Sequence, residues 1–182
     1  MEHGGNEIYY LTGTGNSLKI AKDLAARLGK TTLNSMPRSV RKIEGRIVGF
    51  VFPIYFARPP VFVQEFVERS MFGDIEYLYL IANGGGLFGT GLKILETQLN
   101  GKGQTVHSGF LVGMPGNHPK IASMQKKPHE AYFAREEERI NEIARTVSNE
   151  VAHGVETNLG PLGRFFSHLA FRGQWELSKA HR

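Results

Sequence analysis

Residues 12–17, which read TGTGNS, are the part of the sequence best suited to chemistry. Four of the six side chains are short, neutral hydrogen-bonding groups, and the two glycines let the backbone wrap closely around a ligand. A helix is expected to begin directly after them, so that backbone N–H groups and the helix dipole converge on one point. The segment therefore predicts a cradle for an anion. Because it contains no Lys or Arg, a terminal monophosphate fits it better than a triphosphate.

Two other interpretations of this turn have to be weighed. A Walker A loop would need Gly-Lys-Ser/Thr at its end, which Leu18 and Lys19 do not supply. A tight connection between a strand and a helix, with Asn16 or Ser17 as the helix cap, remains an alternative to the anion cradle.

A second glycine-rich segment, Gly84 to Gly89, formally matches the dinucleotide pattern G-x-G-x-x-G. That fingerprint requires an acidic residue about 20 positions later to hold a ribose hydroxyl. No Asp or Glu occurs between Glu96 and Glu130. We therefore interpret the segment as a flexible backbone wall beside a flat ligand, and not as an NAD site.

Three aromatic residues flank these turns in the sequence: Tyr55, Phe56 and Phe88. Aromatic faces stack on planar rings, so a flat ligand with its phosphate at residues 12–17 would meet them. The alternative is packing in the local core, which suits any one of them but not all three together.

The elements that must position these turns alternate between strands and helices. Blocks of β-branched and aromatic residues predict strands at 7–11, 31–34, 47–52, 77–82 and 105–112. Apolar residues at helical spacing predict four helices: one from the turn at 12–17 to about Leu28, one at about 61–71, one after residue 89 and one at about 130–153. This alternation predicts an α/β fold with a parallel sheet, and the continuous apolar run at 47–52 indicates a central strand buried on both faces. The turns then leave the sheet at its carboxyl edge, where open parallel sheets bind ligands.

The composition excludes several classes of site. The chain has 182 residues, which suits one domain, and no cysteine, so it holds no disulfide, thiolate nucleophile or iron–sulfur cluster of its own. No pair of histidines has the spacing of a local metal site, and no G-x-S-x-G elbow is present. The longest nearly apolar run, residues 47–57, is too short to span a bilayer. The polar N-terminus lacks a secretory signal, so a cytoplasmic location is expected.

The charge is unevenly distributed along the chain. The net charge is +5, from 22 Lys and Arg against 17 Asp and Glu, which favours anionic partners without indicating nucleic acid.

We divide the chain into a domain at 1–156 and a basic, aromatic tail at 157–182, for which a short amphipathic helix is expected. The tail could pack on its own domain, contact a partner or a second copy in a homodimer, or attach to a membrane surface. The three glutamates at 136–138 are expected on the solvated face of the last helix.

The segment at 12–17, placed after a strand, resembles the phosphate loop of flavodoxins. The resemblance continues in Pro53-Ile54-Tyr55 ahead of a proline-initiated helix, in Asn-Gly-Gly-Gly at 83–86, and in Met114-Pro115-Gly116-Asn117. Together these segments are most similar to the flavodoxin-type domain of anaerobe proteins in which such a domain is often fused to a two-cluster ferredoxin. The resemblance covers about residues 7–153.

The resemblance implies a three-layer, doubly wound, five-stranded parallel sheet in the order 2-1-3-4-5, noncovalently bound FMN, and electron transfer between redox partner proteins. It implies no catalytic side chain and no metal. The residues that it implies for the cofactor are Thr12, Gly13, Thr14, Gly15, Asn16 and Ser17 at the phosphate; Pro53, Ile54, Tyr55 and Phe56 in the third-strand loop, where Tyr55 or Phe56 covers one ring face; Asn83, Gly84, Gly85, Gly86 and Phe88 along the pyrimidine edge and other side; and Met114, Gly116 and Asn117 from the fifth-strand loop.

Two features depart from the family pattern. Flavodoxins are usually strongly acidic, whereas this chain carries +5, so an acidic partner such as a ferredoxin is expected. The ferredoxin part is absent, so any iron–sulfur centre must belong to another chain. Two further functions stay open at this point: an FMN-dependent NAD(P)H:quinone or small-molecule reductase, and a flavodoxin-like interaction module without a cofactor.

Overall fold

The computed structural model describes residues 5–38, 42–86, 88–115 and 129–158 of the chain. Within these ranges the strands are β1 (Asn6–Tyr10), β2 (Thr31–Ser35), β3 (Lys42–Ile43), β4 (Ile47–Pro53), β5 (Met71–Phe72), β6 (Tyr77–Gly84), β7 (Ser108–Gly113) and β8 (Gly154–Val155). The helices are α1 (Asn16–Leu28), α2 (Val61–Arg69), α3 (Gly91–Gly101) and α5 (His129–Ser148). The alternation of strands and helices confirms the predicted α/β class.

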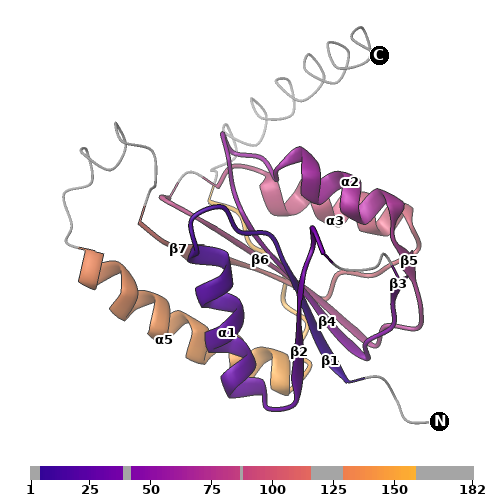
Figure 1. Ribbon diagram of the computed structural model, residues 1–182, viewed down its shortest axis with the longest axis horizontal. Coiled ribbons are helices and arrows are strands. Elements are labelled where there is room, and N and C mark those ends of the chain that lie inside the picture. Colours follow the sequence, from indigo (N-terminus) through magenta and orange to yellow (C-terminus); the bar gives the residue numbers. More distant parts are fainter. Residues whose placement is uncertain (1–4, 39–41, 87, 116–128, 159–182) are drawn as a thin grey trace, which may run out of the picture.

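Six parallel strands form the main sheet, in the order β2-β1-β4-β6-β7-β8 (Figure 1). The predicted count of five strands is therefore wrong. The five predicted strands are all present in the relative order that the resemblance implies, but β8 adds a sixth strand beside β7, where Ser108 pairs with Gly154. The sequence did not reveal β8 because a strand of two residues carries no alternating pattern.

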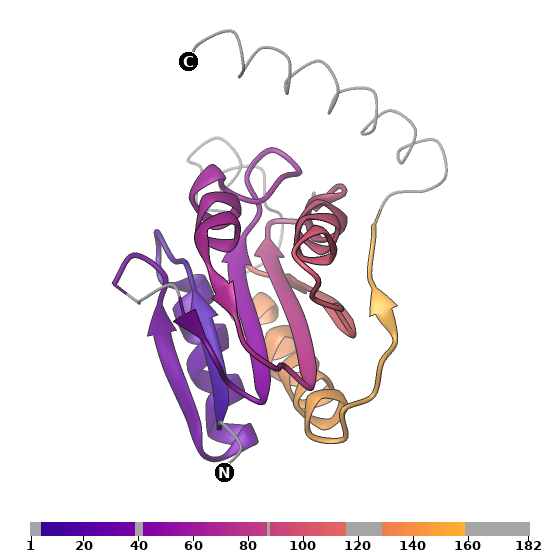
Figure 2. The ribbon, with the colours of Figure 1, turned by 90° about the vertical axis from the view of Figure 1, so that its right-hand side faces the viewer.

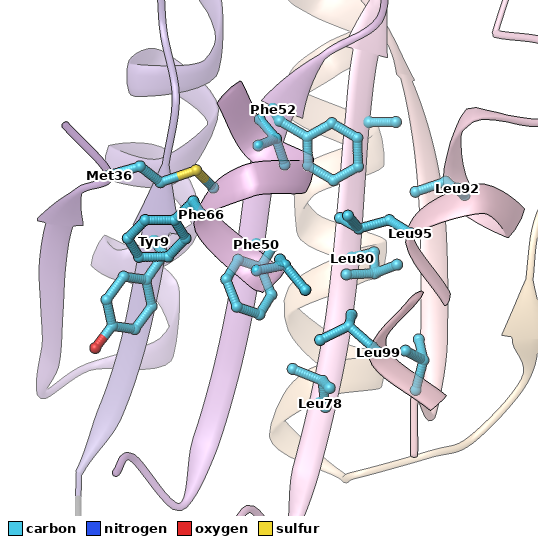
Figure 3. Close-up of a cluster of buried hydrophobic side chains, with 14 of the residues drawn as sticks. Tyr9, Met36, Phe50, Phe52, Phe66, Leu78, Leu80, Leu92, Leu95 and Leu99 are labelled. Carbon is cyan, nitrogen blue, oxygen red and sulfur yellow. The ribbon is translucent and has the colours of Figure 1, made fainter. Parts of the chain in front are cut away.

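Helices cover both faces of the sheet and make three layers (Figures 1 and 2). The helices α1 and α5 lie together on one face, and α2 and α3 lie together on the other. Each face has its own cluster of buried apolar side chains. Figure 3 shows the cluster beneath α2 and α3, in which the ring centroids of Tyr9, Phe50 and Phe66 lie 5.8–6.4 Å apart. The two clusters fix the strands, and thereby the edge from which the glycine-rich turns project.

Strand β4 is buried on both faces, as its apolar run predicted. Its close packing against β6 requires glycine at one position, because a Cβ atom on Gly49 would lie 2.2 Å from Cζ of Tyr79. The ring of Tyr79 fills the space above Gly49, and its hydroxyl is buried without a hydrogen-bond partner. Burial raises the pKa of that hydroxyl well above its ordinary value.

Helix α5 ends at Ser148 and not near residue 153 as predicted. Glu150 adopts the left-handed backbone conformation, with φ 52°. The N–H groups of Glu150 and Val151 donate to the carbonyls of Val147 and Thr146, at 3.0 Å each, which is the Schellman pattern of a helix C-terminus. Val151, within the helix predicted at about 130–153, consequently lies outside α5 and is half exposed. Gly154, the residue directly after the predicted helix, begins β8.

Candidate functional site

The glycine-rich turns gather at the carboxyl edge of the sheet, because all the strands that precede them are parallel. Figure 2 shows β4 and β6 running side by side towards this edge. Backbone hydrogen bonds link the ends of neighbouring strands there: Ile54 N–H donates to the Asn83 carbonyl at 2.8 Å, and Met114 N–H donates to the Gly84 carbonyl at 2.9 Å. The three loops that follow β4, β6 and β7 therefore start from one connected framework.

The turn at 12–17 is shaped by its own residues. The Gly15 N–H donates to Oγ1 of Thr12 at 3.0 Å, and Gly15 has φ 99°, a left-handed conformation that suits glycine. Gly15 is the N-cap of α1, so neither Asn16 nor Ser17 takes that place. The first helical hydrogen bond runs from Lys19 N–H to the Gly15 carbonyl at 2.8 Å, so the N–H groups of residues 16–18 point out of the helix end. Gly13, Thr14 and Gly15 are exposed.

Asn16 and Ser17 connect this turn to the neighbouring loops. The side-chain amide of Asn16 donates to the Pro115 carbonyl at 3.2 Å, next to the end of β7. The buried hydroxyl of Ser17 accepts a hydrogen bond of 2.8 Å from Nδ2 of Asn83, which also donates to the Phe52 carbonyl at 3.0 Å. Because Ser17 acts as an acceptor in this bond, its own hydroxyl proton remains available to a second partner. Asn83, expected along a ligand edge, lies buried beneath the loops and braces them.

The loop after β4 presents two exposed aromatic side chains. Residues 55–58 form a tight turn in which Tyr55 and Arg58 exchange two backbone hydrogen bonds, of 2.9 and 3.1 Å. The two central residues, Phe56 and Ala57, have φ values of 49° and 64°. The Phe56 side chain is 95% exposed and that of Tyr55 is 51% exposed, so neither belongs to the core. A Cβ atom on Gly13 would lie 3.3 Å from the Tyr55 hydroxyl, which places Tyr55 against the turn at 12–17.

The structure buries some of the other predicted site residues in the hydrophobic clusters and leaves others exposed at the edge of the sheet. Phe88 and Met114 are buried, and both pack in the hydrophobic clusters. For Phe88 the alternative interpretation, packing in the local core, is therefore the one that holds. Pro53, Ile54 and Gly84 lie at or directly after the ends of β4 and β6, with Ile54 packed beneath Gly84 and Gly91. Gly85 and Gly86 are exposed at the edge. Gly116 and Asn117 lie outside the described residues.

The glycine-rich loop after β6 is held by a residue from a distant part of the chain. Nδ2 of Asn158 donates to the Gly86 carbonyl at 2.5 Å, and its Oδ1 accepts the Gly89 N–H at 3.2 Å. Gly89 has φ 59°, and a Cβ atom there would lie 2.4 Å from Cβ of Ala57. Gly86 and Gly89 are therefore restrained by contacts with Asn158 and Ala57.

Comparison with known proteins identifies this arrangement. No protein-family model matches the sequence, and no curated protein matches it significantly. Among solved structures, an FMN-dependent NADH-azoreductase from Bacillus anthracis in complex with FMN aligns with a TM-score of 0.57 at 10% identity, over 80% of this chain and 100% of that chain. An NAD(P)H:quinone oxidoreductase from Methanothermobacter marburgensis aligns with a TM-score of 0.54 at 15% identity, over 82% of this chain and 100% of that chain. Oxidised flavodoxin 2 from Bacillus cereus has the same TM-score and identity, over 81% and 99% of the two chains.

The chain has the flavodoxin-like fold. At these identities the likeness concerns architecture, and one architecture hosts the activities that all three names describe. What this chain does with the flavodoxin-like fold must therefore be argued from its own residues.

A half-buried ion-pair cluster links the first turn of α1 to α5. Nζ of Lys19, in the first turn of α1, lies 2.5 Å from a carboxylate oxygen of Asp23 and 2.5 Å from one of Glu136 on α5. The Glu136 side chain is fully buried, although the glutamates at 136–138 were predicted on the solvated face. Burial raises the pKa of the Glu136 carboxyl despite the adjacent lysine, and its other oxygen has no partner. The same contacts raise the pKa of Lys19.

Sequence reasoning missed two components of this site. Lys19 and Asp23 have the i, i+4 spacing of a helix pair, which could have drawn attention to α1, but nothing in the sequence pointed to Glu136 as their partner. Asn158 carried no signal at all, because its contacts with Gly86 and Gly89 come from the far end of the chain. Within the described ranges, no three His, Asp or Glu side chains gather as a metal site, and no helix has the length and apolar character to cross a bilayer.

Proposed function

We propose that this protein binds FMN at the carboxyl edge of the sheet and shuttles electrons between redox partners. The observation that carries the proposal is the turn at 12–17. It offers neutral donors and outward-pointing N–H groups beside two exposed aromatic side chains, in a fold that a flavodoxin and an FMN-bound azoreductase share.

The residues of the turn suit the phosphate of FMN. Gly13, Thr14 and Gly15 are exposed, and a Cβ atom on Gly13 would crowd the Tyr55 hydroxyl at 3.3 Å. The hydroxyls of Thr12, Thr14 and Ser17, the Asn16 amide and the N–H groups of residues 16–18 would hold a monophosphate without any cationic side chain. When bound, FMN supplies one- and two-electron chemistry.

The surrounding residues would position the ring and shield it from water. Phe56 and Tyr55 offer aromatic faces at the surface, where burial against a flat ring would remove apolar area from water. The backbone of the loop at 84–86 would form the opposite edge, and Gly116 and Asn117 would approach from the segment after β7. No side chain is required to act as a general acid or base. The proposal takes residues 1–156 as the FMN-binding domain and extends it to Asn158, whose side chain bonds to Gly86 and Gly89 of the loop after β6.

The choice of partner follows from charge. With a net charge of +5 and no cysteine, the chain suits an acidic redox partner that carries its own iron–sulfur centre, such as a ferredoxin. The similarity to the flavodoxin-type domain of anaerobe fusion proteins supports the same kind of partner. We place the protein in the cytoplasm and assign the part of the tail after Asn158 to a partner contact or a homodimer, which the mass in solution of a chain truncated after Asn158 would test.

The decisive experiment is a titration of the apoprotein with FMN and with riboflavin. Thr14→Asp places a carboxylate in the cradle, and we expect it to weaken FMN binding about 10- to 100-fold through repulsion of the phosphate. Riboflavin, which has no phosphate, should bind the variant as it binds the original protein. Thr97→Asp is the matched control, because Thr97 is exposed and its hydroxyl bonds only to the Lys93 carbonyl of its own helix. Equal FMN affinities for Thr14→Asp and Thr97→Asp would contradict the phosphate assignment.

One observation favours a second candidate function, an FMN-dependent reductase of a quinone or another small flat molecule. The 95% exposure of Phe56 leaves an aromatic face open to a substrate as well as to a partner protein. Consumption of NAD(P)H in the presence of quinones would identify the reductase, whereas a carrier would show none. A folded apoprotein that takes up no FMN would favour the remaining alternative, an interaction module without a cofactor.

A further inference from the structure

Asn158 forms two hydrogen bonds to a single short loop. Its Nδ2 donates to the Gly86 carbonyl at 2.5 Å, and its Oδ1 accepts the Gly89 N–H at 3.2 Å. The bonds require one donor and one acceptor at the end of the same side chain. A carboxamide provides both, a carboxylate provides only the acceptor, and an alkyl group provides neither. The residue type at position 158 is therefore matched to the two backbone groups that it meets.

The loop that Asn158 bonds has unusual need of such support. Gly86 and Gly89 both have positive φ values, of 116° and 59°. Glycine reaches such angles without strain, but it also samples many others, so a glycine-rich loop is poorly fixed by its own backbone. A contact at Ala57 limits Gly89, whereas a Cβ atom on Gly86 would have nothing within 4 Å. On the Gly86 side, the bond from Asn158 supplies the restraint.

Asn158 is itself held in place by the strand that precedes it. Strand β8 pairs with β7, and the Glu156 N–H donates to the Gly109 carbonyl at 2.9 Å. The Glu156 carboxylate accepts the Leu111 N–H at 2.9 Å and forms an ion pair with Arg139 of α5. The clamp on the loop is thus anchored to the edge of the sheet. This gives the unpredicted sixth strand a role at the site.

We propose that Asn158 is a positioning residue that holds the backbone of Gly86 and Gly89 where it receives the ring of bound FMN. This inference rests on the proposed function. The clamp acts on the ring and not on the phosphate, because the loop at 84–89 follows β6 whereas the phosphate turn follows β1. Loss of the clamp should therefore weaken FMN and riboflavin equally, which distinguishes Asn158 from the residues of the phosphate turn.

The test compares Asn158→Ala, Asn158→Asp and the control Asn149→Ala. Asn149 is an exposed asparagine directly after α5, and its side chain bonds to the Arg145 carbonyl in the last turn of that helix. We expect Asn158→Ala to weaken both FMN and riboflavin by about three- to tenfold, as the loss of one or two hydrogen bonds implies. Asn158→Asp should weaken both ligands as well, since a carboxylate offers the Gly86 carbonyl no donor. Asn149→Ala should change neither affinity.

Amide hydrogen exchange in the absence of ligand provides the second measurement. The Gly89 N–H should exchange faster in Asn158→Ala than in the original protein, but remain protected in Asn158→Asp, which keeps the acceptor. If the original protein binds neither ligand, the proposed function fails while the exchange pattern still reports the clamp. If ligands bind but Asn158→Ala leaves both affinities unchanged, or weakens FMN alone, the positioning role is overturned. Unchanged Gly89 exchange in Asn158→Ala would overturn the clamp itself.

Discussion

The two glycine-rich turns at the carboxyl edge are held in opposite ways. The turn at 12–17 is closed by a bond between Thr12 and Gly15, three residues apart, and continues directly into a helix. The loop at 84–89 depends on Asn158, which lies 72 residues after Gly86 and 69 after Gly89, and on contact with Ala57. The first turn is therefore closed by a bond within its own sequence, in addition to the bonds from Asn16 and Ser17 to other loops, whereas Gly86 and Gly89 of the second loop are restrained by distant segments.

This difference separates two tasks that a single ligand would require. A phosphate needs fixed donors at a helix end, which local geometry provides. A flat ring needs walls whose separation matches its thickness, and only contacts between distant segments can set that separation. Substitutions at the two turns should consequently lower the free energy of unfolding by different amounts and for different physical reasons.

The largest effect is expected at Gly89. An Ala side chain there would lie 2.4 Å from Cβ of Ala57 and 2.8 Å from its carbonyl oxygen, at a φ of 59° that alanine adopts with strain. We expect Gly89→Ala to lower the free energy of unfolding by about 2–5 kcal/mol, measured by urea denaturation. A loss below about 1 kcal/mol would mean that the loop moves away from Ala57 easily, and the contrast between the turns would disappear.

A smaller loss is expected at Gly15. Its φ of 99° also disfavours alanine, but nothing lies within 4 Å of the added Cβ atom, so only the backbone strain remains. Gly15→Ala should lower the free energy of unfolding by about 1–2 kcal/mol in the same denaturation experiment. A loss in the free energy of unfolding as large as that of Gly89→Ala would show that a side chain at Gly15, too, collides with another segment.

The smallest effect on stability is expected from the ion pair between Lys19 and Glu136, and it should depend on pH. The native state raises the pKa of Glu136 above the ordinary value of 4.5, so it binds this proton more tightly than the unfolded chain does. Relative to Glu136→Gln, the stability of the original protein should fall as pH rises from about 4.5 through the native pKa, and stay constant above it. Lys19, whose pKa is also raised, adds stability that is lost only in the alkaline range above 10.5.

Thermal denaturation of the two proteins at a series of pH values measures this difference. The contrary outcome is that the stability of the original protein, relative to Glu136→Gln, falls as pH decreases below the ordinary glutamate range. It would mean that the native state lowers the pKa of Glu136 and does not raise it. The loop at 84–89 offers a built-in comparison, because Asn158 does not titrate and its clamp should be insensitive to the same change in pH.

The parts of the fold that could be predicted are those with a local cause. The turn at 12–17 and helix α1 follow from glycines, short polar residues and apolar residues at helical spacing, all within one segment. The burial of β4 follows from its continuous apolar run. Each of these features can be derived from fewer than 20 neighbouring residues.

The remaining features depend on contacts that the sequence pattern does not encode. Glu150 ends α5 in a conformation that favours glycine, so the signal that normally marks a helix end is missing. Glu136 is buried because Lys19 meets it from another helix, and Phe88 turns inwards because a pocket of apolar side chains beside α3 accepts it. Asn158 illustrates the same limitation at the candidate site.

The turn at 55–58 has a consequence for engineering. Two consecutive non-glycine residues, Phe56 and Ala57, occupy the left-handed region there, where an Asn-Gly pair would sit without strain. A designer seeking greater heat resistance would find an accessible improvement at this dipeptide. The same replacement would remove the Phe56 ring, which is 95% exposed, so the more stable variant would lose an aromatic face that the proposed FMN site uses.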